Sequence, residues 1–184
     1  MKKILVAAGI LIVVVFAAAL VFRFTTKSYS PESNTVFEKD GLKISVFYNR
    51  PSKKGRVIFG GLVPYGKTWR TGANEATTFE TNKDLVIGDK TLPAGKYSLW
   101  TVPNEQSWSV VFNSTIPNWG IDVMNDGEAA RDPKTDVLVV DAPVVNTEKE
   151  FEQFTISIEK TDDMLELVLA WDKTLVFVPL VVSE

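Results

Sequence analysis

Positively charged and aromatic side chains gather in one segment of this chain, between residues 41 and 74. The segment holds seven basic residues and no acidic residue, whereas residues 75–184 hold 8 basic and 20 acidic residues. Guanidinium groups bind carboxylates and phosphates through paired hydrogen bonds, and aromatic faces stack on the rings of ligands. The segment therefore predicts a site for a small anionic or polyhydroxylated ligand, such as a carbohydrate. The candidate binding residues are Arg50, Arg56, Tyr65, Trp69, Arg70, Asn74 and Glu75.

The same charge pattern has a second interpretation, in which each arginine pairs with a carboxylate elsewhere in an acidic domain. The protein would then be a purely structural protein of the cell envelope. The position of the guanidinium groups separates the two interpretations. They converge on an open cleft in the first and lie against their own carboxylates in the second.

The chain of 184 residues contains no His and no Cys. This excludes Ser-His-Asp and Cys-His nucleophile pairs, imidazole bases, thiolate chemistry, disulfides and metal sites built from His or Cys. We therefore expect no cofactor. Residues 28–184 carry a net charge of −7, which would repel nucleic acid, so a nucleic-acid partner is not expected.

A pair of carboxylates remains as a route to catalysis, as in glycoside hydrolases. Glu75 is the acid that directly follows the basic, aromatic segment, so a carboxylate-dependent glycan hydrolase built around Glu75 is the alternative function. Neighbouring arginines would lower the pKa of Glu75 and make it a poor general acid. We therefore expect a non-catalytic binding or interaction module and name no catalytic residue.

Two further motifs resemble known sites but lack a required part. Gly61–Thr68 fits the G-x-x-x-x-G-K-[ST] pattern of phosphate-binding loops, which must open a helix. A glycine and a Thr-Thr-Phe run follow within residues 72–79 and disfavour a helix, so we interpret this motif as a glycine-rich loop. The acidic run between Asp122 and Asp136 lacks required EF-hand ligand positions, and we interpret it as a solvated loop without a metal.

The residues after 35 predict an all-β fold, an antiparallel β-sandwich of immunoglobulin-like or fibronectin-like character. Short runs of alternating apolar and polar residues are separated by turn signals, and Asp40-Gly41 predicts a hairpin turn between Val36–Glu38 and Leu42–Tyr48. Further strands are expected at Arg56–Phe59, Thr77–Glu80, Asp84–Ile87, Lys96–Val102, Trp108–Asn113, Val137–Asp141, Phe154–Glu159, Leu165–Trp171 and Leu175–Val182.

Local features refine this β-rich fold. Leu92–Leu99 resembles a tyrosine corner, in which the hydroxyl of Tyr97 bonds the backbone a few residues upstream and Gly95 takes a positive φ. Tryptophans at strand positions are expected in the core, whereas Trp69 and Trp119 lie in loops. The long loops, at residues 49–55, 60–75 and 114–135, are where function is expected, with one short helix near Glu128–Arg131.

An N-terminal segment precedes this domain. Ile4–Phe22 is a run of 19 uncharged, mostly apolar residues, which as a helix reaches roughly 28 Å, about the thickness of the hydrocarbon layer. A cleaved signal peptide ending near Ala17–Ala19 is the alternative. We divide the chain into an anchor or signal peptide at 1–24, a polar tether at 25–35 and a β-sandwich domain at 36–184.

Several runs of this sequence resemble a bacterial family catalogued as domain of unknown function 2911. They comprise residues 50–52, 55–56, 58–67 and 69–77, followed by Leu92–Gly95, Tyr97–Leu99, Trp108, Phe112-Asn113 and Trp119-Gly120. The resemblance implies a bacterial, exported protein and carries over no catalytic residue. We therefore expect a single-pass protein of the bacterial inner membrane, held by its N-terminal helix with its domain on the periplasmic side.

Overall fold

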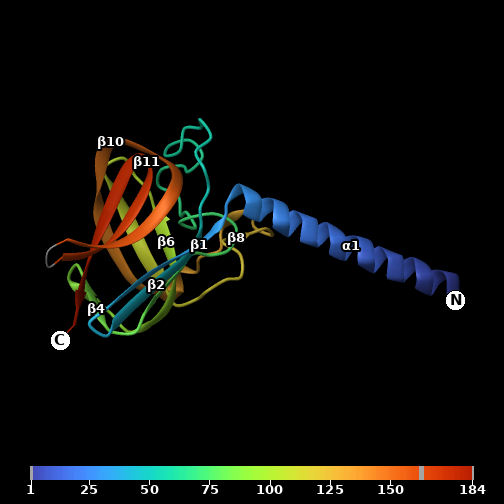
Figure 1. Ribbon diagram of the computed structural model, residues 1–184, viewed down its shortest axis with the longest axis horizontal. Coiled ribbons are helices and arrows are strands. Elements are labelled where there is room, and N and C mark those ends of the chain that lie inside the picture. Colours follow the sequence, from blue (N-terminus) through green and yellow to red (C-terminus); the bar gives the residue numbers. More distant parts are fainter. Residues whose placement is uncertain (1, 162–163, 184) are drawn as a thin grey trace.

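The computed structural model describes residues 2–161 and 164–183, which form one long helix and a β-domain (Figure 1). Helix α1, Lys2–Tyr29, projects from the domain. The strands are β1 (Glu32–Lys39), β2 (Leu42–Asn49), β3 (Thr78–Thr81), β4 (Leu85–Ile87), β5 (Lys90–Leu92), β6 (Gly95–Val102), β7 (Ser107–Asn113), β8 (Ile121–Asp122), β9 (Glu128–Ala129), β10 (Asp136–Thr161) and β11 (Met164–Val182), and a 3-10 turn at Pro133–Thr135 precedes β10.

One large antiparallel sheet forms the domain, with the strand order β1-β2-β3-β6-β7-β10-β11-β4-β5. Strand β10 pairs first with β7, over Asp136–Pro143, and then with β11 as far as Thr161. The register of this second ladder shifts on both sides of Phe151, as at β-bulges, which bend a strand. Because one long, bent strand serves two partners, the sheet folds over on itself.

The two layers of this sheet meet across the core. Thr35 of β1 donates a hydrogen bond to the carbonyl of Ile156 in β10 (2.7 Å), and the Ile156 amide donates to the hydroxyl of Tyr48 in β2 (2.9 Å). The side chains of Trp108 and Trp171 between the layers are no more than 2% exposed. The predictions of an all-β, sandwich-like fold and of buried strand tryptophans are confirmed.

Local turn signals predicted two features correctly. Asp40 and Gly41, with φ of 52° and 73°, form the two-residue turn between β1 and β2. The hydroxyl of Tyr97 donates to the carbonyl of Pro93 at 2.8 Å, as in a tyrosine corner. The expectation for Gly95 was wrong: its φ is not positive, and a Cβ there would lie 3.1 Å from the Tyr97 hydroxyl oxygen. Glycine is favoured at this position because the Tyr97 side chain leaves little space for a Cβ atom.

The tyrosine corner gives a first prediction. Tyr97→Phe should lower the free energy of unfolding by about 1 kcal/mol, because the Pro93 carbonyl loses its partner, and the melting temperature should fall by about 2–4 °C. Thermal unfolding followed by circular dichroism measures this. Tyr65→Phe is the matched control, since the exposed Tyr65 hydroxyl makes no hydrogen bond within residues 2–161 and 164–183. Equal melting temperatures for both variants would contradict a stabilising corner.

Three local predictions were wrong. Residues 56–59 do not form a strand: Ile58 enters the core while Val57 is 72% exposed, and the carbonyls of Val57 and Ile58 accept hydrogen bonds from the amides of Leu62 and Val63. Residues 128–129 form strand β9, because the positive φ of Asp126 and Gly127 turns the chain back onto β8. The polar residues 25–35 do not form an irregular tether: α1 continues to Tyr29 and β1 begins at Glu32.

Candidate functional site

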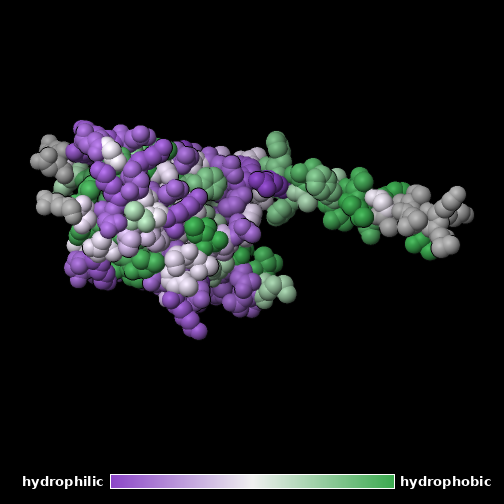
Figure 2. Space-filling view, turned by 90° about the horizontal axis from the view of Figure 1, so that it is seen from below, coloured by the Kyte–Doolittle hydropathy of each residue, from purple (hydrophilic) through white to green (hydrophobic). Residues whose placement is uncertain are grey.

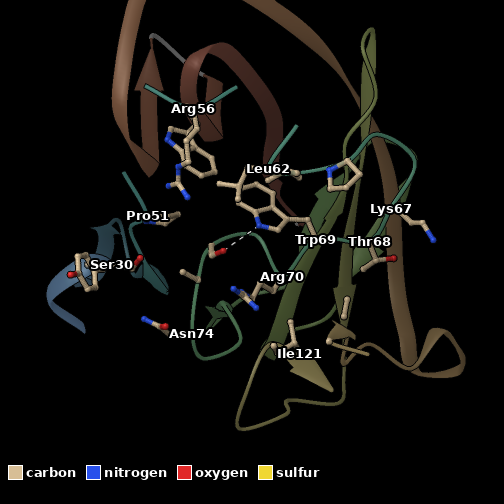
Figure 3. A pocket seen from close by; sticks show the side chains of 18 of the residues that line it. Ser30, Pro51, Arg56, Leu62, Lys67, Thr68, Trp69, Arg70, Asn74 and Ile121 are labelled. Atoms are coloured by element: carbon tan, nitrogen blue, oxygen red, sulfur yellow. Dashed lines mark hydrogen bonds between the residues drawn. The ribbon is translucent and has the colours of Figure 1, made fainter. Parts of the chain in front are cut away.

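An open cleft lies at the end of the domain from which α1 emerges (Figure 3). Its volume is about 770 Å³, within the usual range for small-molecule sites. The end of α1 with Ser30, loop residues 51–56, loop residues 62–74 and the β8–β9 hairpin meet around it. Four basic and two acidic side chains line its walls, namely Lys54, Arg56, Lys67, Arg70, Asp126 and Glu128.

The loop of residues 62–74 is tied to the sheet by its backbone. Trp69 and Thr101 exchange two backbone hydrogen bonds of 2.7 and 3.1 Å, and the Gly66 amide donates to the Pro103 carbonyl. Thr71 and Gly72 have φ of 53° and 150°, so the chain turns sharply after Arg70. Residues 69–77 form bends and extended chain, which is not the helix that a phosphate-binding loop must open.

Trp69 forms the apolar floor of the cleft together with Trp171. Their rings stack at 5.7 Å with an interplanar angle of 17°. Phe154 and Trp108 meet the Trp69 ring edge-on at 4.8 and 6.1 Å, and the indole NH donates to the Gly72 carbonyl at 3.2 Å. Trp69 is therefore at once part of the aromatic core and a surface of the cleft.

Arg70 enters the cleft, and its charge has no partner among the residues that the structure describes. Its stem packs against Gly120, where a Cβ would lie 2.5 Å from the Arg70 Cδ. Its Nε is buried, and no described residue accepts a hydrogen bond from it. Among the ion pairs of the described residues, none includes Arg70. Burial lowers the pKa of Arg70 below its ordinary value, yet a guanidinium stays protonated at neutral pH.

The other predicted arginines differ from Arg70. Arg56 also lines the cleft, and its guanidinium donates to the carbonyls of Lys53 (3.0 Å) and Ser52 (2.6 Å). Arg50 lies outside the cleft and donates to the Phe154 carbonyl and the Thr155 hydroxyl on β10. In the part of the chain that the structure describes, neither arginine pairs with a carboxylate.

Tyr65, Asn74 and Glu75 are also separated. Tyr65 lies outside the cleft lining, with its ring against Gly60, where a Cβ would lie within 2.8 Å of it. Asn74 lines the cleft, with a φ of 57°, and its amide reaches the Thr26 carbonyl of α1 at 3.4 Å. The cleft therefore brings together Arg56, Trp69, Arg70 and Asn74 of the seven predicted residues.

Glu75 binds the end of α1 and does not face the cleft. Its Oε2 accepts hydrogen bonds from Lys27 (2.5 Å) and Asn49 (3.1 Å), and Lys27 also pairs with Glu32. Burial alone would raise the pKa of Glu75, but the bonds from Lys27, its own backbone and Asn49 hold that pKa below its ordinary value. A general acid requires the opposite shift.

The part of the site that comes from α1 and the acidic loop carries no motif that indicates a site. Thr26, Tyr29 and Ser30 were assigned to the tether, and Asp126 and Glu128 to a solvated loop. The carboxylates of Asp122 and Asp132 accept from the amides of Met124 and Lys134 two residues further on. Within residues 2–161 and 164–183, no cluster of three acidic residues is arranged to hold a metal.

Comparison with known proteins identifies the family. No curated protein and no solved structure matches the chain. A family model described as "Protein of unknown function (DUF2911)" matches residues 30–180, which comprise most of the chain and leave out nearly all of α1. The resemblance noted in residues 50–77 and 92–120 is confirmed, and the protein belongs to the DUF2911 family.

Proposed function

We propose that this protein is a membrane-anchored binding module whose cleft holds a small anionic or polyhydroxylated ligand. Arg70 carries this proposal, because its stem is buried and its Nε finds no acceptor among the described residues. A buried charge that lacks hydrogen-bond partners costs free energy. A carboxylate or phosphate in the cleft would accept from that guanidinium and recover the cost. A binding site that destabilises the unliganded fold in this way is common among proteins.

The rest of the cleft suits a ligand with both a ring and a charge. The side chains of Arg56 and Arg70 enter it from different walls, and the Trp69 indole lies between them (Figure 3). A sugar ring on the exposed face of Trp69 would place an acidic substituent within reach of Arg70 or Arg56. Hydroxyls and backbone groups at Thr68 and Gly72 supply further polar contacts.

The anchor follows from α1, which contains one stretch, Gly9–Tyr29, long and apolar enough to cross a membrane. In the proposal this helix is retained in a bacterial inner membrane as a signal anchor, and the domain lies on the periplasmic side. The contacts of Thr26 and Lys27 with the domain support a fixed junction between helix and domain. Lys2 and Lys3 precede the apolar run and are compatible with a cytoplasmic N-terminus.

The two alternatives receive less support. A hydrolase built around Glu75 would need that carboxyl in the cleft with a raised pKa, whereas Lys27 and Asn49 hold it elsewhere as a carboxylate. A purely structural role for the basic segment would pair its arginines with carboxylates. Arg50 and Arg56 instead bind carbonyl or hydroxyl oxygens, and Arg70 faces the cleft.

A thermal-shift experiment on the full chain in detergent tests the proposal. Glucuronate, glucose 1-phosphate and inorganic phosphate are compared with neutral glucose. We expect the charged probes to raise the melting temperature of the wild type by more than glucose does, because only they supply an acceptor charge for Arg70. Arg70→Met should weaken charged-probe binding by about tenfold or more, since a hydrogen bond to a charged group contributes about 1.5–3 kcal/mol.

The same variant without a probe provides the control. Arg70→Met keeps an apolar stem against Gly120 and removes the unpaired charge, so its unliganded melting temperature should equal or exceed that of the wild type. Lys96→Met removes an exposed charge outside the cleft and should leave binding unchanged. A lower melting temperature for Arg70→Met, with no charged probe shifting the wild type, would assign Arg70 to fold stability and refute the proposal.

A further inference from the structure

The tip of the β8–β9 hairpin presents two apolar side chains to solvent. Val123 is 75% exposed and Met124 is 94% exposed. The tip is a well-formed turn: the Asp122 carboxylate accepts from the Met124 amide (2.9 Å), and the Asp122 carbonyl accepts from the amides of Asn125 and Gly127. The hairpin backbone therefore holds both side chains outward. Exposing these apolar side chains to water costs free energy unless something covers them.

This tip lies at the end of the domain that meets α1. Residues 126–129 of the hairpin line the same cleft as Thr26, Tyr29 and Ser30 of the helix end. Figure 1 shows the hairpin on the helix side of the domain, and Figure 2 shows apolar atoms at the domain edge nearest the helix. Val57 and Leu62, in loops beside the cleft, are 72% and 46% exposed. The exposed apolar tip of the hairpin thus lies on the side of the domain from which the anchor arrives.

The length of α1 places this end at the membrane surface. The apolar run ends near Phe24 and the helix ends at Tyr29, an advance of about 8 Å along the axis. The headgroup layer on each side of a bilayer is about 5–8 Å thick. Ser30 and Pro31 alone separate the helix from β1, so the domain begins where the headgroups end.

The junction also fixes how the domain is oriented. Lys27 binds Glu75 and Asn49, Asn74 reaches the Thr26 carbonyl, and the Lys54 ammonium lies 4.4 Å from the centre of the Tyr29 ring. These contacts come from β2 and from two separate loops. A helix held by so many contacts cannot swivel freely about its last turn, so the same face of the domain is always directed at the bilayer.

We infer that the Val123–Met124 tip inserts into the interfacial layer of the bilayer that holds α1, as a second membrane contact that sets the cleft mouth against the headgroups. This inference rests on the retained anchor of the proposed function. Acidic Asp122, Asp126 and Glu128 on the hairpin oppose basic Lys54, Arg56 and Lys67 on the facing loops. Apolar insertion, and not attraction to anionic lipid, is therefore the driving force, and it should occur in neutral bilayers as well.

The absence of cysteine makes the test direct, because one introduced cysteine is the only labelling position. Met124→Cys in the full chain is labelled with an environment-sensitive fluorophore and reconstituted at one chain per phosphatidylcholine nanodisc, with or without phosphatidylglycerol. Met164→Cys is the matched control, since Met164 is 58% exposed and its neighbour Leu165 lines a hollow with Lys39 at the far end of β1.

We expect lipids with a nitroxide high on the acyl chain to quench the Met124 label at least about threefold more than the Met164 label. A water-soluble quencher should show the reverse order. Equal access of the soluble quencher to both labels overturns the inference, as does protection that appears only when several chains share a disc. A chain that loses α1 and does not enter discs refutes the retained anchor itself, which intact mass and flotation reveal separately.

Discussion

Replacing Trp69 by alanine is expected to lower the free energy of unfolding by about 3–4 kcal/mol, because a large aromatic side chain leaves a cavity that its neighbours fill only partly. Trp69 contacts Trp171 in a stack and Phe154, Trp108 and Phe59 edge-on. The melting temperature should fall by about 6–16 °C for a domain of this size. Chemical denaturation with a constant m-value measures the free-energy change.

Trp119→Ala is the control for this substitution. Trp119 also lies in a loop, but none of the aromatic contacts among the described residues includes it. We expect its loss to cost about 1 kcal/mol or less. If Trp69→Ala were as mild as Trp119→Ala, Trp69 would be a solvent-exposed platform and the floor of the cleft would not be continuous with the core.

Trp69 also shows which parts of the structure were predictable. Features set by a few adjacent residues were predicted correctly, as with the Asp40-Gly41 turn and the Tyr97 corner. Alternation along strands correctly placed Trp100, Trp108 and Trp171 in the core. Trp69 lies in a loop without alternation, so its sequence neighbours carry no sign that β10 and β11 supply Phe154 and Trp171 to cover it.

Long-range contacts explain the remaining differences. The sequence predicted separate strands at 137–141 and 154–159 and at 165–171 and 175–182, whereas each pair is one continuous strand, β10 or β11. Asp172, with a φ of 54°, is an irregularity within β11 and not a turn between strands. A turn between two strands and an irregularity within one strand have the same local polar composition. Pairing with a neighbouring strand decides which of the two forms.

The candidate site was predicted in part for the same reason. Arg56, Trp69, Arg70 and Asn74 share the cleft, because the loop from 62 to 74 is tied to β6. Arg50 and Glu75 lie outside the cleft because they bind residues that are distant in the sequence. Arg50 donates a hydrogen bond to Thr155, and Glu75 accepts one from Lys27. Lys27 lies in the segment predicted as a polar tether, and nothing in the residues around it indicates the ion pair that it makes with Glu75.

The second large effect concerns the pair of Arg131 and Asp136, which lies under the cleft loop. Both side chains are about 15% exposed or less. The Arg131 Nε donates to the Asp136 Oδ1 at 3.0 Å, its Nη2 bonds the Oδ2, and its Nη1 reaches the Thr68 hydroxyl of the cleft wall at 3.3 Å. Asn113 donates to the same carboxylate at 2.8 Å. The carboxylate thus orients a guanidinium that supports the loop bearing Trp69 and Arg70.

Asp136→Ala is expected to lower the free energy of unfolding by about 3 kcal/mol, because it leaves the Arg131 charge buried without its partner. The double variant Arg131→Met, Asp136→Ala should be more stable than Asp136→Ala alone, since no buried charge is then left unpaired. Asp141→Ala, an exposed carboxylate on the same strand, should change stability by about 0.5 kcal/mol or less. Additive losses in the double variant would show that Arg131 stabilises the fold independently of Asp136.

Acidification should reproduce part of this loss in the wild type. Burial alone would raise the pKa of Asp136, but the hydrogen bonds from Arg131 and Asn113 hold it below its ordinary value. A carboxyl with a depressed folded-state pKa contributes its full stabilisation above its unfolded pKa of about 3.9, and this is lost as the pH falls through the folded value. The pKa of Glu75 is also held below its ordinary value, so the free energy of unfolding of the wild type and of Asp136→Ala will fall in acid.

The difference in unfolding free energy between wild type and Asp136→Ala should therefore be constant above about pH 5 and shrink below about pH 4. A difference that does not change down to the acid limit would mean that the Asp136 carboxylate does not neutralise Arg131, and the support of the cleft wall would then depend on packing alone.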